Sequence, residues 1–252
     1  MRMSGRIARS VLGAVLVYGA WMHSADAMGD VAAEALAVSA FKGDTSALGQ
    51  LRDLANRGDA TAQDWLGAYR QRTHDIARAV FWYEKAARQG NVTAQNNLGT
   101  LYAKGVGTPK NLSQAAYWYR KAAEQGNATA QNNLGILYHE GQGVAKNDKI
   151  AADWLSKAAN QGNARAQYNL SELYAQGEGR PRNIVISYAL YLLATTPATS
   201  SGADRDAGPM SKQVPGMTGQ QVRAAQALER RMRMNGILET LAAKGTAAGG
   251  RN

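Results

Sequence analysis

One segment of the chain repeats at a fixed spacing, and this spacing limits the fold more than any other feature of the sequence. Residues 94–129 and 130–165 align without gaps at a period of 36, and a third copy begins at residue 166. An earlier copy over 62–93 has 32 residues, because four are missing where the others carry a Gly-x-Gly loop. A period of this length is typical of repeat proteins whose units bury their apolar faces by stacking on one another.

Each copy contains two apolar stripes with helical spacing, which predicts a pair of helices. In the copy 94–129 the stripes consist of Ala94, Leu98, Leu101 and Tyr102, then Ala115, Trp118, Tyr119, Ala122 and Ala123. We expect Gly105 and Gly107 to end the first helix and Gly126 to end the second, with Asn111 or Ser113 as its N-cap. The connecting loops are short, so the two helices should be antiparallel neighbours.

The repeated glycines and tryptophans have structural explanations. Gly99 and Gly135 fall in mid-helix, where glycine costs about 0.8–1 kcal/mol relative to alanine, so we expect close helix approach there. The Gly-x-Gly at 105–107 recurs at 141–143 and 177–179, which indicates a structural turn and not a phosphate-binding loop. The recurring aromatic residues Trp82, Trp118 and Trp154 are predicted to lie in the core.

These repeated residues resemble the Sel1-like repeat family, a branch of the tetratricopeptide-like α-solenoids. The residues that carry the resemblance are Ala94, Leu98, Gly99, Leu101, Tyr102, Gly105, Gly107, Ala115, Trp118, Tyr119, Lys121, Ala122, Ala123, Gln125 and Gly126, and they recur almost entirely over 130–162. The resemblance covers roughly residues 44–195. It implies an all-α fold, a right-handed superhelical solenoid of antiparallel helix pairs, with the first helices lining a concave face.

The resemblance also carries expectations about function. Family members are mostly adaptors and regulators that bind other proteins. Some exported relatives are cysteine-rich and have been linked to β-lactam binding or hydrolysis, whereas this chain contains no cysteine. The lack of cysteine also excludes disulfides and thiolate metal sites.

Degenerate or non-repeat segments lie on both sides of the regular copies. Residues 28–61 are predicted to form an N-terminal helical cap or degenerate repeat, with helices over 31–41 and 45–56, Asp44 as an N-cap, and stops at Gly43 and Gly58. Residues 166–196 are interpreted as a degenerate repeat. Its apolar segment 184–194 has only 11 residues, so a buried helix is favoured over a membrane span.

The C-terminal region is predicted to hold an insertion, a helix and a tail. Residues 197–217 are rich in Pro, Gly, Ser and Ala and are expected to be flexible. Thr218–Gln221 matches a capping box, which predicts a capping helix over 218–244, and residues 245–252 should be disordered. The apolar side of that helix would consist of Val222, Ala225, Leu228, Met232, Leu238 and Leu241, and its basic residues are Arg223, Arg230, Arg231 and Arg233. A membrane-surface or partner helix is the alternative.

The N-terminus has the pattern of a secretory signal peptide. Its basic residues are Arg2, Arg6 and Arg9, and an uncharged, mostly apolar run follows over 10–22. Ala25-Asp26-Ala27 then forms an A-x-A site, so cleavage is expected before Met28. The sequence therefore predicts a signal peptide over 1–27 and an exported, periplasmic protein.

The formal net charge of +10 becomes +8 for residues 28–252, because the signal peptide contains three Arg and one Asp. An exported chain is not expected to meet nucleic acid. Acidic proteins, anionic lipid headgroups and cell-wall polymers remain as partners of a basic surface, and the excess charge equally fits simple solubility.

The search for a catalytic constellation finds none. Only His74 and His139 follow the predicted signal peptide, and they lie in different repeats without metal-ligand spacing. His139 is expected at the surface. We therefore predict a chain without cofactor, metal site or enzymatic activity.

Positions that vary between copies provide the candidate binding site. Residues opposite Leu98 on the first helix, and their equivalents, should face the concave groove by resemblance to tetratricopeptide arrays. The candidates are Asp64, Thr93, Asn96, Thr100, Thr129, Asn132, Ile136, His139, Arg165, Tyr168 and Glu172. A polar row of mixed charge with one aromatic suits an extended peptide or a partner helix, although a merely hydrated surface would look the same.

The leading hypothesis is an exported scaffold or regulatory adaptor that binds an unidentified protein or peptide in this groove. The alternatives are an envelope enzyme or β-lactam-binding protein, suggested by family analogy alone, and a charge-driven binder of cell wall or membrane surface.

Overall fold

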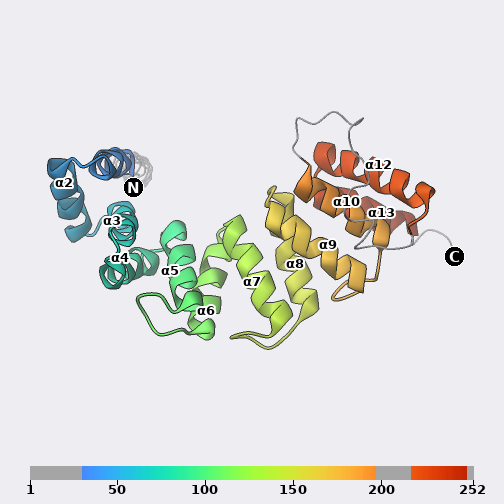
Figure 1. Cartoon of the computed structure of the whole chain (residues 1–252), viewed down its shortest axis with the longest axis horizontal. Helices are drawn as coiled ribbons and strands as arrows, with labels where there is room; N and C mark the ends of the chain where they lie inside the picture. Colours follow the sequence, from blue (N-terminus) through green and yellow to red (C-terminus); the bar gives the residue numbers. More distant parts are fainter. Residues whose placement is uncertain (1–29, 197–216, 249–252) are drawn as a thin grey trace, which may run out of the picture. The chain divides into compact units, whose positions relative to one another are not determined.

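The computed structural model describes residues 30–196 and 217–248, and every regular element among them is a helix (Figure 1). The helices are residues 30–41, α2 Thr45–Asn56, α3 Ala60–Arg72, α4 Ile76–Arg88, α5 Val92–Lys104, α6 Leu112–Glu124, α7 Ala128–Glu140, α8 Asp148–Asn160, α9 Ala164–Gln176, α10 Ile184–Thr195, α12 Gly219–Asn235 and α13 Ile237–Ala248. Consecutive helices pack in pairs, as in Sel1 repeat solenoids, which confirms the predicted fold class. The predicted signal peptide and nearly all of the predicted insertion lie outside the described residues.

The chain divides into two compact units, residues 1–98 with 106–108 and residues 99–105 with 109–252. In the first unit α3 packs against both α2 and α4, and the core contains Leu51, Leu66 and Trp82. In the second unit α7, α8, α9 and α10 pack in succession around a core rich in alanine and leucine. Small side chains let these helices approach closely, which is the packing that the composition favours.

The predicted helix ends are confirmed where the sequence offered a cap. The Asp44 carboxylate accepts hydrogen bonds from the backbone N–H groups of Ser46 and Ala47 at the start of α2. Asn111, and not Ser113, caps α6 by accepting from the N–H of Gln114 at 3.0 Å. These side chains satisfy backbone donors that have no partner inside the helix.

The mid-helix glycines allow close helix contact, as the sequence predicted. A Cβ atom on Gly99 would lie 2.7 Å from Cδ1 of Tyr119, and one on Gly135 would lie 2.8 Å from Cγ of Leu155. Both distances are shorter than ordinary van der Waals contact. A larger residue in place of Gly99 or Gly135 would therefore clash with Tyr119 or Leu155 of the second helix.

The Gly-x-Gly loops are structural turns, and each one packs on the second helix of the preceding repeat. A Cβ atom on Gly143 would lie 2.3 Å from the carbonyl carbon of Leu112, and one on Gly179 would lie 2.0 Å from the carbonyl oxygen of Asp148. Leu112 and Asp148 are the first residues of α6 and α8. The loop glycines have φ angles of 71° and 67°, a left-handed conformation that favours glycine.

A buried glutamine in each repeat links successive helices, and the sequence analysis did not assign it a role. The side-chain amide of Gln131 donates to the carbonyl oxygen of Ala123 at 3.0 Å, close to the end of α6. Its own Oε1 accepts from Nε2 of Gln161 at 2.8 Å. Equivalent bonds join Gln63 to Ala55, Gln95 to Ala87 and Gln167 to Ala159.

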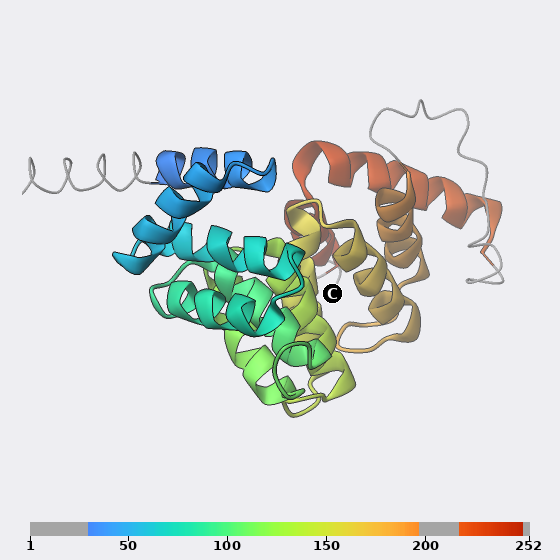
Figure 2. The ribbon, with the colours of Figure 1, turned by 60° about the vertical axis from the view of Figure 1, so that its left-hand side comes forward.

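The C-terminal region contains two helices where the sequence predicted one over 218–244. The predicted capping box at Thr218 and Gln221 is present, but Gly236, with φ 81°, separates α12 from α13. Helix α12 packs against α10 (Figures 1 and 2). The Asn160 side chain of α8 accepts from the N–H groups of Ile237 and Leu238 at the start of α13.

Other C-terminal predictions also need correction. Leu238 is exposed and does not belong to the apolar side, because the break at Gly236 changes the face that the following residues present. Helix α13 runs to Ala248, so the predicted disorder from residue 245 is wrong over 245–248. Glu229 is fully buried and forms an ion pair with Arg233, so this arginine is not part of an exposed basic side. Among the described residues, no helix is long and apolar enough to cross a membrane.

Candidate functional site

The predicted groove residues do not share one exposed face. Thr93, Thr129, Arg165 and Glu172 are exposed, Asn96, Thr100, Ile136, His139 and Tyr168 are half-buried, and Asp64 and Asn132 are buried. Helix α7 packs against α8 of its own repeat, against α6 of the preceding repeat and, less extensively, against α9. It therefore has more than one buried side, which an angle measured from a single apolar stripe does not reveal.

Asn132, one of the predicted groove residues, packs between two repeats and does not face solvent. Its Oδ1 accepts from Nδ2 of Asn169 in α9 at 3.0 Å, and only 3% of the residue is exposed. Tyr168, one residue earlier in α9, has its ring 6.3 Å from that of Tyr191 in α10. The prediction that this row stands free of the core is wrong for Asn132, which is an amide bridge between two repeats.

Thr100 is also held by a packing contact within the second unit. Its Oγ1 accepts a hydrogen bond of 3.1 Å from the hydroxyl of Tyr119 in α6. Asn133 also bonds to this hydroxyl, and burial raises the pKa of Tyr119. The side chain of Thr100 thus positions a core tyrosine.

His139 was expected at the surface, and the structure places it in a half-buried position at the end of α7. There its side chain lies close to residues of α8 and of the loop after α9. Its Nδ1 lies 2.8 Å from Oδ1 of Asp148 in α8 and 3.8 Å from Oε2 of Glu178, which belongs to the loop after α9. Lys146 approaches the other oxygen of Asp148 at 3.6 Å. Within residues 30–196 and 217–248, no group of three or more His, Cys, Asp or Glu residues is placed to hold a metal ion.

Asp64 occupies, in the first unit, the position that Asn132 occupies in the second. It is 8% exposed, and its Oδ1 has no hydrogen-bond partner. Burial raises the pKa of Asp64 from its ordinary 3.8 to about 7, partly offset by a hydrogen bond from Asn97. Burial raises the pKa of the nearby Tyr83, and the negative charge of Asp64 raises it further. A buried carboxylic acid in this position is therefore a source of pH-dependent stability.

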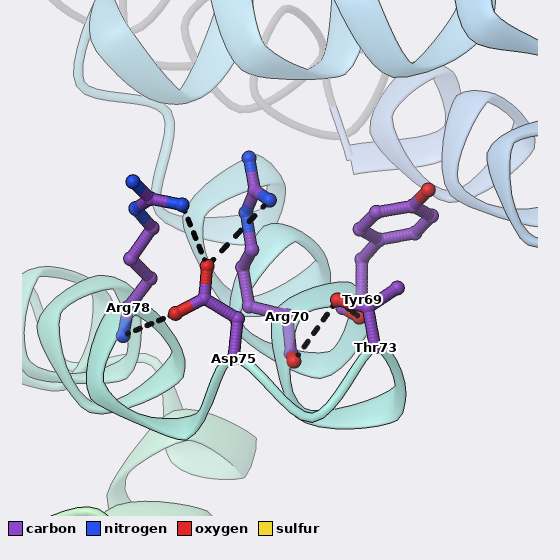
Figure 3. Close-up of polar contacts among 5 residues, drawn as sticks. All are labelled: Tyr69, Arg70, Thr73, Asp75 and Arg78. Atoms are coloured by element: carbon purple, nitrogen blue, oxygen red, sulfur yellow. Dashed lines mark hydrogen bonds and ion pairs between the residues drawn. The ribbon is translucent and has the colours of Figure 1, made fainter.

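The turn between α3 and α4 carries a polar cluster that the sequence analysis missed (Figure 3). The Asp75 carboxylate accepts from the N–H of Arg78 at 3.4 Å and lies 2.8 Å from its guanidinium, and Arg70 approaches the same carboxylate at 3.8 Å. Thr73 donates to the carbonyl oxygens of Tyr69 and Arg70. The sequence did contain a signal for this cluster, because Asp75 precedes Arg78 at the spacing of an N-cap. The signal was missed because the short repeat lacks the Gly-x-Gly loop that marks the turn between the two helices in the other repeats.

An open hollow of about 560 Å³ lies near this turn, and it was also missed. Its lining residues come from helix 30–41, the residue after it, and α3, and they are Val38, Phe41, Lys42, Ala68 and Arg72. Their sequence separation and the lack of any periodic relation between them explain why pattern analysis could not find the hollow.

Stacked antiparallel helix pairs with glycine loops between the helices define an α-solenoid repeat protein. A comparison with protein-family models identifies the repeat: the Sel1 repeat model matches residues 60–91, 92–127, 128–163 and 164–196. The chain belongs to the Sel1 repeat family. These boundaries start two residues before the copies aligned from the sequence, which begin at 62, 94, 130 and 166.

Two solved structures are similar to this chain over much of its length. A Sel1 repeat protein from Oxalobacter formigenes is 34% identical with a TM-score of 0.59, over 65% of this chain and 67% of that protein. A protective antigen with an SLR fold from uropathogenic Escherichia coli strains is 38% identical with a TM-score of 0.56, over 58% of this chain. The match spans only 32% of the length of the E. coli protein. A comparison with curated proteins found no match.

Proposed function

We propose that this chain is an exported scaffold that binds a peptide or a partner protein through the exposed side chains of its first helices. Sel1 repeats generally mediate protein–protein interactions. The observation that carries the proposal is the contrast between buried and exposed positions of α7 and α9. Leu134 and Leu170 are equivalent and fully buried, whereas the exposed Thr129 corresponds to an exposed Arg165. The buried leucine is the same in both repeats, whereas the exposed residue differs between them.

Export is the second part of this proposal, and it is supported by the basic residues, apolar run and A-x-A site of residues 1–27. The similar E. coli protein is described as a protective antigen, which agrees with a location where antibodies reach it. We expect the N-terminus of protein recovered from the periplasm to be Met28. Recovery of chains that begin at Met1 from the cytoplasm would contradict export.

Partner capture tests the binding surface. Residues 28–252 would be immobilised, exposed to envelope extract and analysed by mass spectrometry. Reversing two exposed charges, Arg165→Glu with Glu172→Lys, should abolish capture of the specific partner without changing the melting curve, since exposed substitutions usually alter stability by about 0.5 kcal/mol or less. Arg230→Gln with Arg231→Gln in α12 is the matched control and should retain the partner. The opposite result would move the binding surface to α12 and favour charge-driven binding to anionic surfaces.

We further propose that the chain is not an enzyme. Sel1 repeat proteins are typically scaffolds. The whole sequence contains no cysteine that would support the activity linked to cysteine-rich relatives. The purified protein should not hydrolyse β-lactams. Hydrolysis that persists through purification and is abolished by one point substitution would overturn this expectation.

A further inference from the structure

The hollow between helix 30–41 and α3 combines an apolar floor with two cations. Val38 lines the hollow and is 44% exposed, so it presents an apolar surface to solvent beside Phe41. The Phe41 ring is held in place by two aromatic neighbours, with ring centroids 6.2 Å from Trp65 and 5.8 Å from Tyr69. The guanidinium carbon of Arg72 lies 5.2 Å from the Phe41 centroid. The floor and one cation are therefore oriented before any ligand arrives.

The charges around the hollow differ from those of the neighbouring turn. At the turn, Arg70 and Arg78 both approach the carboxylate of Asp75 (Figure 3). Among the described residues, neither Lys42 nor Arg72 forms an ion pair with an Asp or Glu side chain. In the described part of the first unit, two cations therefore lie without acidic partners beside an exposed apolar surface, whereas Arg70 and Arg78 in the neighbouring turn are paired.

We infer that this hollow binds an acidic linear peptide, with an apolar side chain against Phe41 and Val38 and flanking carboxylates paired with Lys42 and Arg72. The volume of about 560 Å³ suits one or two side chains. An arginine that already lies over an aromatic ring presents its planar N–H groups to a carboxylate with little further loss of freedom. This inference rests on the proposed function, because it gives the chemical class of one ligand of the scaffold.

A matched set of short peptides tests the inference directly. The probes are acetyl-Asp-Asp-Phe-Asp-Asp-amide and its counterparts with lysine or serine in place of aspartate. The readout is the indole N–H resonance of Trp65 in the ¹⁵N-labelled chain, assigned through Trp65→Phe, because this ring packs on Phe41. The aspartate peptide should shift this resonance in a saturable way, and the lysine and serine peptides should not. Added salt should weaken the binding, since the interaction depends on partly exposed charges.

Charge-removing variants separate the hollow from the general positive charge of the protein. Lys42→Gln with Arg72→Gln should weaken binding of the aspartate peptide by at least tenfold. Arg78→Gln removes a cation of the same unit that is already paired with Asp75, and it should leave binding unchanged. A Trp65 resonance that does not move up to the solubility limit of the peptide, or equal affinity in the double variant, would overturn the inference.

The outcomes also distinguish this inference from the scaffold function. A partner captured through Arg165 and Glu172, together with no peptide binding at Trp65, would retain the scaffold function and remove only the hollow. Peptide binding at Trp65 without any captured partner would retain the hollow and remove the partner proposed for the first helices.

Discussion

The α3–α4 repeat and the α7–α8 repeat both consist of an antiparallel helix pair, but the turn that connects the two helices is built differently in each. After α7 the chain turns through Gly141 and Gly143, and the second glycine packs on the backbone of the preceding repeat. After α3 the turn is four residues shorter, its left-handed residue is His74 with φ 61°, and side chains around Asp75 hold it. The first solution couples neighbouring repeats through backbone contact, and the second closes the turn within one repeat.

The two repeats also differ at one buried position of the first helix. Asn132 in α7 exchanges amide hydrogen bonds with its neighbours, whereas Asp64 in α3 has one oxygen without a partner. An amide donates and accepts at any pH, but a buried carboxyl group is satisfied best when it is protonated. The same fold position is therefore insensitive to pH in one repeat and sensitive in the other.

The largest predicted effect should be the same in both repeats. Leu66 and Leu134 are equivalent and both fully buried. Replacement of either by Ala should lower the free energy of unfolding by about 2–5 kcal/mol, because it removes buried methyl groups and leaves a cavity. Chemical denaturation of the two variants measures this. A melting curve like that of the parent for either variant would show that the helix is not packed as described.

The exchange of Asp64 and Asn132 tests the pH difference. The pKa of Asp64 is raised in the folded state from 3.8 to about 7, so the folded chain binds more protons than the unfolded chain between these values. The contribution of Asp64 to stability should be largest below pH 4, fall as the pH rises to about 7, and then level off. At about 1.4 kcal/mol for each pH unit between the two pKa values, the loss amounts to up to about 4 kcal/mol.

Asp64→Asn should therefore stabilise the chain at neutral pH and remove the decline between pH 4 and 7. The reverse change, Asn132→Asp, should introduce a similar decline, because it places a carboxyl group at a position that is 3% exposed. Denaturation measured at several pH values gives the profiles. If Asp64→Asn and the parent show parallel profiles, Asp64 is not the group responsible.

Helices and caps could be predicted from the sequence because local spacing determines them. The stripes around Leu98 and the N-caps at Asp44 and Asn111 depend on residues within a few positions of each other. The burial of Asn132 could not be predicted in the same way, because it depends on Asn169 in the next repeat. The break at Gly236 had a local signal, an Asn-Gly pair inside an amphipathic pattern, but the continuing apolar periodicity concealed it.

The candidate site was less predictable than the fold. Four exposed positions of the predicted row, including Arg165 and Glu172, remain available for binding. The hollow depends on Phe41 and Arg72, which come from helices of different repeats and follow no common period. Residues that build the repeat recur in the sequence, whereas residues that give it a particular ligand do not, so periodicity reveals the first set and not the second.

The glycine loop provides the third prediction. Gly143→Ala should lower stability by about 2–3 kcal/mol, because alanine is strained at φ 71° and its Cβ would meet the backbone of Leu112 at 2.3 Å. Gly162→Ala is a useful control, since Gly162 has a similar φ of 82° but nothing within 4 Å of its Cβ position. The difference between the two losses measures the contact with the preceding repeat. Equal losses would mean that the loop contributes only its backbone conformation.

The smallest effect is expected at His74. It decides whether the short turn stores backbone strain or whether contacts of the histidine side chain offset that strain. His74 adopts φ 61°, where a residue with a side chain costs about 1–2 kcal/mol and glycine costs little. His74→Gly removes this strain but also gives the unfolded chain more freedom, which offsets about 0.5–1 kcal/mol of the gain. The net result should be a stabilisation of about 1 kcal/mol or less, measured by chemical denaturation. If His74→Gly destabilises the chain, the imidazole itself holds the turn, and the short connection depends on His74 as well as on Asp75.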